Sequence, residues 1–547
     1  MAVPILLFVV ALVARALTAS IAPEPAYPDA YYYANLAREL AAGEGFQVDF
    51  IWNFVEVGGT LPAVGTLPIP SNAHWMPLAA LVQVPFIWIL GPTAQAAGMP
   101  FWLVAAAVAP VTYLIGRDAG MPSWQAAIAG LLVAMPAAVA PFLGQPDNFA
   151  LFMLLGALAL WLCARGLRGH RRSFAVGGLV VGLAFVSRTD GVLLGVPFAL
   201  AFLVDLLREP RGSRIGWGPA LACAVGFSLV AAPWLIRQLD VFGSLSPSSA
   251  SGRILFISEY RELYSVSSET TLDAFLSQGP AALIWSRLGG LGSALIIFAA
   301  MPLLVFLVPP MLLGAWRQRR CPDFLPWLVY AGVLFAFAAL VSAVHVPFGT
   351  FIHSAVALVP HAYLLVLLGI ATAVRWVAAR RSTWDAPRAT RNFSLMVAVV
   401  VVVASLSTSL STMEAWTVER DSRIDVLTAL AANADPDDVV MSPDAGAYRY
   451  HGGWSGIVTP DDPLPVVKEA MRRYDVRWLA LERAHATRAL AGVLAGKTRP
   501  DWLSDPIVEV AAPARDGEAP SDEAGPSLPR AALYAVCLTP DDTRCSA

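Results

Sequence analysis

One acidic residue at the edge of the first apolar run is the strongest candidate for catalysis. Asp29 follows the apolar stretch 2–21 and stands near the start of a segment, 28–46, in which apolar and polar residues fall on different faces at helical spacing. Gly43 and Gly45 end that helical pattern. An aspartate in this position could cap the helix, or it could act as a general base in a wet cavity beside a bilayer. The two roles are compatible.

Two other proton-carrying residues stand at the ends of apolar runs. Asp147 belongs to the short turn 144–148, where it is either a turn residue or a second acid in the same cavity as Asp29. His353 opens the apolar run 353–374. Carboxylates and imidazoles are common proton donors and acceptors in enzymes, so both residues are candidates for the site.

Two arginines could supply positive charge at the same ends. Arg188 lies in a tight turn, where it could simply pair with Asp190. Arg237 ends the apolar run 216–236, and its long side chain could merely reach the interface. An arginine at membrane depth is also a residue that binds a lipid phosphate.

The segment 22–97 adds Tyr32, Glu44 and His74 as candidates for contact with an acceptor. A lone histidine beside a tryptophan is more often a hydrogen-bonded interface residue than a catalyst, and His74 precedes Trp75.

Membrane spans must position these residues. The chain has 547 residues, a mean hydropathy of +0.61, 57% hydrophobic residues and only 14% charged ones, which is the composition of a polytopic α-helical membrane protein. A net charge of −3 without a basic patch argues against a nucleic-acid partner. A span needs roughly 20 apolar residues, which predicts about eleven. They are 2–21, 98–116, 123–142, 149–165, 173–187, 191–207, 216–236, 291–314, 324–343, 353–374 and 393–412.

Arginine placement predicts the topology. The segment 77–90 is apolar but short and contains Pro85, so we interpret it as interfacial or re-entrant. All arginine-rich connections then fall on one side, which the positive-inside rule makes cytoplasmic, together with the N-terminus. These connections are 165–172, 208–214, 317–320 and 375–391. The prediction is a multi-pass protein of the cell membrane.

This topology divides the chain into a transmembrane domain, 1–412, and an extracytoplasmic tail, 413–547. Two loops of the first domain, 22–97 and 237–290, are also external. Helical and strand-like patterns alternate in the tail, which predicts a small α/β domain with a disordered loop at 513–529.

Cysteine usage is consistent with an external tail. Cys537 and Cys545 are close enough in sequence to form a disulfide if that end of the chain is extracytoplasmic.

Taken in order, these motifs resemble the GT-C superfamily of integral-membrane glycosyltransferases, in particular the protein O-mannosyltransferase and aminoarabinose-transferase-like enzymes of families 39 and 83. The likeness covers roughly residues 1–245 and rests on the order and placement of the motifs. They are Asp29-x-x-Tyr32-Tyr33, His74-x-x-Pro77-Leu78, Gly116-Arg117-Asp118-x-Gly120, Pro146-Asp147, Ser187-Arg188-x-Asp190-Gly191 and Pro233-Trp234-x-x-Arg237.

The resemblance implies transfer of a sugar from a polyprenyl-phosphate donor to a glycan, lipid or protein acceptor at the extracytoplasmic face. Asp29 would be the general base and Asp147 the second acid, while Arg237, with Arg188 or His353, would bind the donor phosphate. One base without a nucleophile and acid pair predicts a single inverting displacement. The lipid-linked sugar is a substrate rather than a cofactor, and a divalent metal is an open alternative.

The chain departs from the family pattern at three places. Ala30 follows Asp29, where many relatives carry an Asp-Glu pair. His74 stands where others have a lysine or glutamate before paired prolines, and His353 stands where an arginine is frequent.

Two other function classes remain. A transporter or lipid flippase would also use intramembrane charges, but it predicts inverted repeats or broken helices at the midplane. The sequence contains no internal repeat, and its polar residues gather at one face. A non-catalytic scaffold is the third class. No nucleotide-binding or metalloprotease motif is present.

Overall fold

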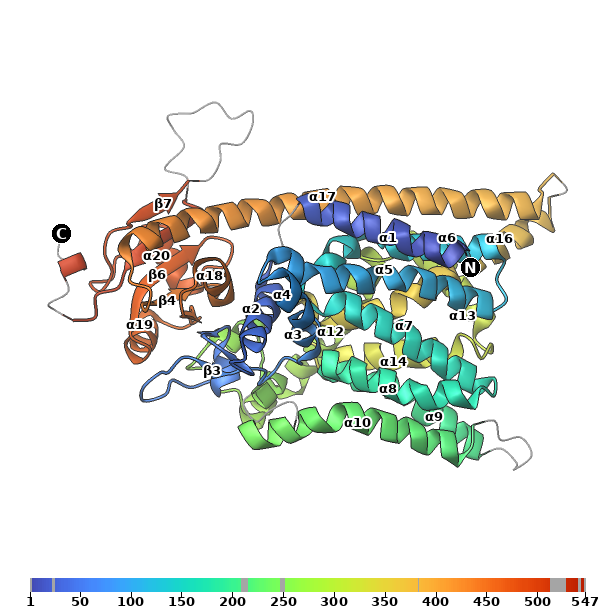
Figure 1. Ribbon diagram of the computed structural model, residues 1–547, viewed down its shortest axis with the longest axis horizontal. Coiled ribbons are helices and arrows are strands. Elements are labelled where there is room, and N and C mark those ends of the chain that lie inside the picture. Colours follow the sequence, from blue (N-terminus) through green and yellow to red (C-terminus); the bar gives the residue numbers. More distant parts are fainter. Residues whose placement is uncertain are drawn as a thin grey trace. The chain divides into compact units, whose positions relative to one another are not determined.

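The computed structural model of this protein is mostly helical (Figure 1). It describes residues 2–21, 25–207, 215–245, 251–381, 383–511, 528–539 and 543–545. The chain forms two compact units, each built from three separate stretches of sequence. Unit 1 comprises Met1–Pro25, Trp75–Asp240 and Gln278–Glu414, and unit 2 comprises Ala26–His74, Val241–Ser277 and Ala415–Ala547.

Unit 1 is an assembly of apolar helices. Its elements are α1 (Ala2–Ile21), α3 (Leu78–Leu81), α4 (Val84–Leu90), α5 (Ala94–Asp118), α6 (Ser123–Ala134), η2 (Ala137–Gly144), α7 (Asn148–Leu167), α8 (Arg171–Ser187), η3 (Thr189–Leu194), α9 (Gly195–Leu206), α10 (Trp217–Phe242), α12 (Gly279–Ala300), α13 (Val308–Gln318), α14 (Leu325–Leu340), η7 (Val346–Phe348), α15 (Thr350–Ala355), η8 (Val356–Leu358), α16 (Val359–Ala378) and the first part of α17 (Ala386–Asn433).

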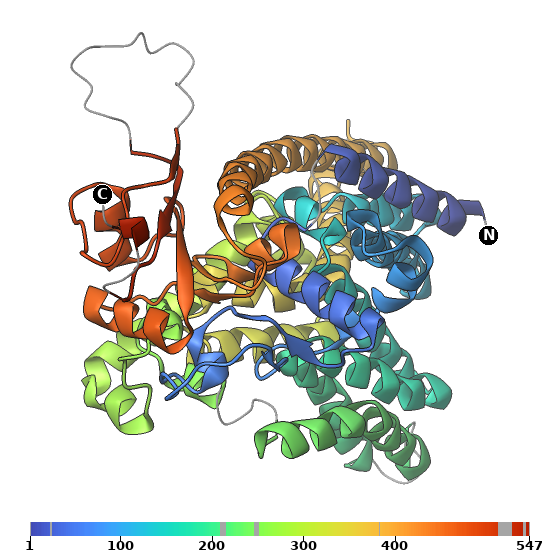
Figure 2. The same cartoon turned by 60° about the vertical axis from the view of Figure 1, so that its left-hand side comes forward.

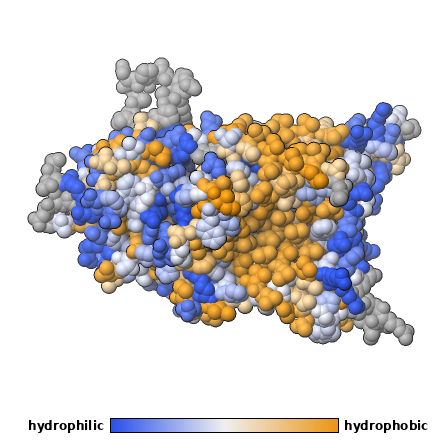
Figure 3. Space-filling model, viewed as in Figure 1, coloured by the Kyte–Doolittle hydropathy of each residue, from blue (hydrophilic) through white to orange (hydrophobic). Residues whose placement is uncertain are grey.

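Large apolar side chains cover the outside of these helices. Leu229 of α10 is 68% exposed and Ile5 of α1 is 62% exposed, and Figure 3 shows hydrophobic residues gathered over the visible face of α1, α5, α7, α8 and α10. A surface of this kind is unfavourable in water and is typical of helices that contact lipid. The protein is therefore a multi-pass membrane protein.

The number of spans differs from the predicted eleven. Within the described ranges, eight helices are long and apolar enough to cross a membrane, or nine if the bent pair α6 and η2 is one span. The predicted spans 173–187 and 324–343 correspond to α8 and α14, which have only 17 and 16 residues. The segment 77–90 forms the short helices α3 and α4, as its length predicts.

The predicted span 291–314 is wrong. The helix in this region, α12, begins at Gly279 and ends at Ala300, and the chain then turns before α13. Pro302, Pro309 and Pro310 lie within the predicted span. Proline removes a helical hydrogen bond and clashes with the preceding turn, so one straight helix cannot continue through them.

Unit 2 is an α/β domain. Its elements are α2 (Pro28–Ala42), β1 (Gln47–Val48), β2 (Phe50–Ile51), η1 (Phe54–Val57), β3 (Ile69–Pro70), η5 (Ser251–Phe256), η6 (Tyr260–Tyr264), α11 (Leu272–Ser277), the second part of α17, β4 (Val439–Ser442), α18 (Ala445–Gly452), β5 (Gly456–Val458), α19 (Leu464–Arg473), β6 (Val476–Glu482), α20 (Arg488–Leu494), β7 (Val508–Val510), β8 (Ala531–Ala535) and η9 (Thr543–Cys545). The sheet order is β2-β5-β4-β6-β8-β7, with the first four strands parallel and the last two antiparallel to their neighbours.

The first loop contributes directly to this sheet. β2 pairs with β5, and Ile51 and Phe54 lie in the same apolar core as Met441 and Leu479. Figure 2 shows α2 beside α18, and Asn35 donates a hydrogen bond to the carbonyl of Gly446 at 2.7 Å. Much of the first loop therefore folds with the tail, a division different from the predicted boundary at 412.

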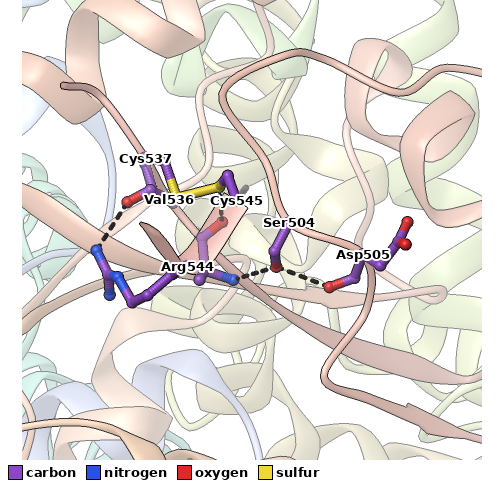
Figure 4. Close-up of a disulfide and its surroundings, with 7 residues drawn as sticks. Ser504, Asp505, Val536, Cys537, Arg544 and Cys545 are labelled. Carbon is purple, nitrogen blue, oxygen red and sulfur yellow. Dashed lines mark hydrogen bonds between the residues drawn. A yellow bond between two sulfur atoms is a disulfide. The ribbon is translucent and has the colours of Figure 1, made fainter. Parts of the chain in front are cut away.

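The C-terminal strand is followed by a disulfide between Cys537 and Cys545 (Figure 4). Arg544, beside Cys545, donates a hydrogen bond at 3.0 Å to the carbonyl of Val536, the residue that follows β8. Residues 513–527 of the predicted disordered loop 513–529, and the basic connection 208–214, lie outside the described residues.

Candidate active site

In unit 1, a buried acid and a histidine meet at the start of two helices. Asp147 is fully buried and is the N-cap of α7, where it accepts a hydrogen bond from the Asn148 amide. Its other carboxylate oxygen lies 2.9 Å from His353 Nε2. The two residues are 206 positions apart in sequence, and their contact joins α7 to α15.

The hydrogen bond of the second imidazole nitrogen indicates how the Asp147–His353 pair is protonated. His353 Nδ1 lies 2.9 Å from the carbonyl oxygen of Gly349, which can only accept a hydrogen bond. Nδ1 must therefore carry a hydrogen, and one further proton lies between Nε2 and Asp147. The pair is either an imidazolium with a carboxylate or a neutral imidazole with a carboxylic acid. Either form can exchange a proton with a substrate.

Arg188 is hydrogen-bonded to the helix that carries His353. Its Nε donates to Asp190 at 3.1 Å and to the Ser354 hydroxyl at 3.2 Å, and its Nη2 donates to the Thr350 carbonyl at 3.3 Å. Ser354 also donates to Asp190. Ser354 follows His353 directly, so α15 carries both a hydrogen-bond partner of Arg188 and the histidine of the Asp147–His353 pair.

Arg237 lies near the end of α10. Its guanidinium is 4.9 Å from the centre of the Trp234 ring, a distance typical of a cation–π contact. The side chain is half-buried. Trp234, three residues earlier on the same helix, therefore helps to position the guanidinium of Arg237.

In unit 2, Asp29 occupies the first turn of α2 but is not its cap. The helix begins at Pro28, its N-cap is Tyr27, and Asp29 is the second helical residue. A carboxylate in this turn interacts favourably with the helix dipole. Tyr27 therefore occupies the N-cap position that Asp29 was expected to fill, and its side chain makes no capping hydrogen bond.

Two tyrosines near Asp29 are residues that the sequence analysis did not identify. Burial, with the Asp29 carboxylate as the next cause, raises the pKa of Tyr260 to about 12. Burial chiefly, with a smaller effect of Asp29, also raises the pKa of Tyr264 well above its usual value. Both hydroxyls are thus protonated donors near the carboxylate at neutral pH. They come from η6, in the segment 237–290, which carries no motif of its own.

The other loop candidates lie at different places in unit 2. Glu44 is exposed just beyond the end of α2, about 20 Å along a 15-residue helix from Asp29. His74 is half-buried, and its ring centre lies 6.3 Å from that of Trp52. Unit 2 therefore does not bring Glu44 to Asp29.

Tyr32 is fully buried and supports the loop that precedes His74. Its hydroxyl accepts a hydrogen bond from the Asn72 amide at 2.7 Å and donates to Glu56 Oε1 at 3.1 Å. Glu56 Oε2 is buried without a hydrogen-bond partner in the part of the chain that the structure describes. Burial raises the pKa of Glu56 to about 8, so this carboxyl group is protonated at neutral pH.

We expect Glu56→Gln to flatten the pH dependence of the stability of unit 2. The folded pKa of about 8 exceeds the ordinary value of 4.5, so the stabilisation from this group is complete below pH 4.5 and is lost as pH rises through 8. The slope is at most about 1.4 kcal/mol per pH unit. Thermal unfolding of the purified protein at pH 5, 6, 7 and 8 measures it. Glu269→Gln, which changes an exposed glutamate of the same unit, should keep the wild-type slope. An unchanged slope in Glu56→Gln would contradict the expectation.

Comparisons with known proteins agree with the architecture. The family described as dolichyl-phosphate-mannose-protein mannosyltransferase matches residues 73–236. A search of curated protein sequences finds no match.

Solved structures of similar fold extend over the whole chain. The chain is similar to ArnT from Cupriavidus metallidurans bound to undecaprenyl phosphate, with a TM-score of 0.52, 14% identity and 98% of each chain covered. The apo form of that protein gives a TM-score of 0.50 with 15% identity, covering 97% of each chain. The oligosaccharyltransferase of Archaeoglobus fulgidus gives a TM-score of 0.48 with 12% identity, covering 88% of this chain and 69% of that one. The chain therefore has the fold of the GT-C superfamily of integral-membrane glycosyltransferases.

Proposed function

We propose that this protein is a membrane glycosyltransferase that moves a sugar from a polyprenyl-phosphate donor to an acceptor hydroxyl at the extracytoplasmic face. The observation that carries the proposal is the buried Asp147–His353 contact beside Arg188, in a chain with the GT-C fold. The matched family and the ArnT structure are described with dolichyl-phosphate mannose and undecaprenyl phosphate, which suggests a polyprenyl phosphate as the leaving group.

In this reaction the acceptor oxygen forms a bond to the anomeric carbon as the bond from that carbon to the phosphate oxygen breaks. Asp29 takes the acceptor proton as the general base. The electron pair of the broken bond goes to the departing polyprenyl phosphate, which gains one negative charge, so the leaving group needs cations rather than an acid. Arg237, Arg188 and His353 are the proposed sources of that positive charge. A single displacement of this kind inverts the anomeric centre.

A divalent metal fits part of this scheme. Asp147 and His353 offer a carboxylate oxygen and an imidazole nitrogen 2.9 Å apart, two ligand types that zinc accepts. Bound there, a metal would replace the proton between the two side chains and would supply positive charge for the leaving phosphate. Loss of transfer after chelation, with recovery on adding zinc or manganese, would support such a metal, and full activity after chelation would exclude it.

A transporter or flippase is the second candidate, because one pair of apolar helices among the described residues is broken by a sharp bend. α6 and η2 form a pair bent by 62°, which is a feature of many transporters. In an enzyme, such a break can instead serve to position a catalytic residue.

One experiment separates the two functions. The full-length protein in nanodiscs is incubated with dolichyl-phosphate mannose or undecaprenyl-phosphate-linked sugars and a glycan, lipid or peptide acceptor panel. We expect release of polyprenyl phosphate together with an inverted sugar linkage on one acceptor. His353→Phe should reduce this turnover strongly, because it removes the proton shared with Asp147. Sugar-lipid movement across liposomes without cleavage of any donor would instead favour the transporter.

A further inference from the structure

A prolyl break divides the helix that leads to Asp147. α6 ends at Ala134 and η2 begins at Ala137, with Pro136 between them and a second proline, Pro141, inside η2. Ala137 has a φ of +50°, a left-handed conformation that is uncommon for a residue other than glycine. The break leaves backbone carbonyls without helical partners. In a membrane-spanning unit such groups must be satisfied by other protein groups.

Arg15 satisfies the carbonyls on both sides of the break. It belongs to α1, its exposure is only 1%, and it lies 125 positions before the far carbonyl that it contacts. Its Nη2 donates to the Ala134 carbonyl at 2.8 Å, and its Nη1 donates to the Ala140 carbonyl. One planar guanidinium therefore bridges the end of α6 and the middle of η2. A lysine ammonium is a point charge on a flexible stem and lacks this fixed fork.

Hydroxyl groups from α17 donate hydrogen bonds to backbone carbonyls between Ala134 and Ala140. Ser405 donates to the Met135 carbonyl at 2.6 Å and Thr408 donates to the Ala137 carbonyl at 3.4 Å. At the far end of η2, the Trp102 indole donates to the Gly144 carbonyl at 3.1 Å. The segment that ends three residues before Asp147 is thus fixed at both ends by side chains from other helices.

We propose that Arg15 is a positioning residue for Asp147. By bridging the prolyl break, it fixes the direction of η2 and so the place where Asp147 caps α7 and meets His353. This inference rests on the proposed function, in which Asp147 belongs to the catalytic site. A charged residue at membrane depth is costly and usually functional, which agrees with this role.

The experiment compares Arg15→Met and Arg15→Lys in the full-length protein, by hydrogen exchange and by transfer kinetics with dolichyl-phosphate mannose and undecaprenyl-phosphate-linked sugars as donors. In Arg15→Met we expect faster amide exchange in peptides covering 137–147. We also expect a 10- to 100-fold lower kcat, with the donor KM changed less than twofold, because the catalytic geometry shifts while donor contacts remain. Arg15→Lys should recover part of the lost kcat and part of the exchange protection.

Arg117→Met is the matched control. Arg117 likewise donates to a backbone carbonyl, that of Met121 at 2.9 Å, but it bridges no break, so wild-type exchange over 137–147 and wild-type kcat are expected. Unchanged exchange over 137–147 in Arg15→Met would overturn the inference, as would a wild-type kcat per folded molecule.

Asp147→Asn is assayed in parallel. Full activity in that variant would rule out a catalytic role of Asp147, whereas the exchange data would still show whether Arg15 fixes the segment 137–147.

Discussion

Asp29→Asn is expected to lower sugar transfer by about 10²- to 10⁴-fold, the range that a positioned general base contributes. Asparagine has nearly the shape of aspartate but cannot accept the acceptor proton. The residue lies in the first turn of α2, where loss of a negative charge costs about 0.3–1 kcal/mol of helix stability. The fold should therefore persist while turnover fails. Steady-state release of polyprenyl phosphate, with thermal unfolding of the same samples, measures both.

The control for this prediction is an acid in unit 2 that is exposed and far along the chain. Asp425→Asn changes such a residue on α17 and should keep wild-type turnover. Full activity in Asp29→Asn would rule out Asp29 as the base. Equal losses in both variants would point to a general effect of charge rather than to catalysis.

Arg423→Met is expected to destabilise unit 2 by about 3–5 kcal/mol, because removing one partner of a buried ion pair leaves the other uncompensated. Arg423 is 2% exposed and makes two hydrogen bonds of 2.8 Å to the Glu482 carboxylate. Its Nη2 also lies 3.8 Å from Asp444. For a domain of this size the loss corresponds to a fall in melting temperature on the order of 10 °C.

This network also reaches the helix that carries Asp29. Arg423 Nη1 lies 3.4 Å from the Tyr31 hydroxyl, which is in turn 3.1 Å from His451. Burial, opposed by Arg423, raises the pKa of Asp444 to about 6. Without the arginine, the buried Glu482 side chain loses both of these hydrogen bonds, and Asp444 loses a nearby positive charge.

The double variant Arg423→Met/Glu482→Leu tests that explanation. Replacing a buried ion pair by apolar side chains of similar size is often neutral or stabilising, so the double variant should recover most of the lost melting temperature. If it melts as low as Arg423→Met alone, the unpaired carboxylate is not the cause. A melting temperature within 1 or 2 °C of wild type in Arg423→Met would show that the pair contributes little.

Sequence patterns predicted the features that depend only on residues close together in the chain. Hydropathy located most of the spans, because the requirement for a long apolar run is a property of one segment. The succession of helical and strand-like patterns predicted the α/β character of the tail, which contains β4, β6, β8 and α19. The error at 291–314 arose because hydropathy alone does not register how several prolines end a helix, and the start of α12 includes a less apolar stretch with Arg287.

The candidate site was predicted only in part. Asp147, His353 and Arg188 were named separately, but nothing in their spacing indicated that Asp147 would share a proton with His353. The pairing of Arg188 with Asp190 was foreseen, since the two residues are neighbours in one turn. Tyr260 and Tyr264 were missed because they lie in a loop whose sequence has no periodic signal.

The sequence alone determined the membrane class of this protein, the α/β character of its tail and the polar residues at the ends of its helices. Each of these follows from local composition and period, which a single segment carries. Only the tertiary structure decided that Arg15 bridges the break before Asp147, that β2 joins the C-terminal sheet and that Tyr31 reaches Arg423, 392 residues away. These contacts join residues that are distant in the chain, and they depend on how whole helices and strands pack rather than on any pattern within one of them.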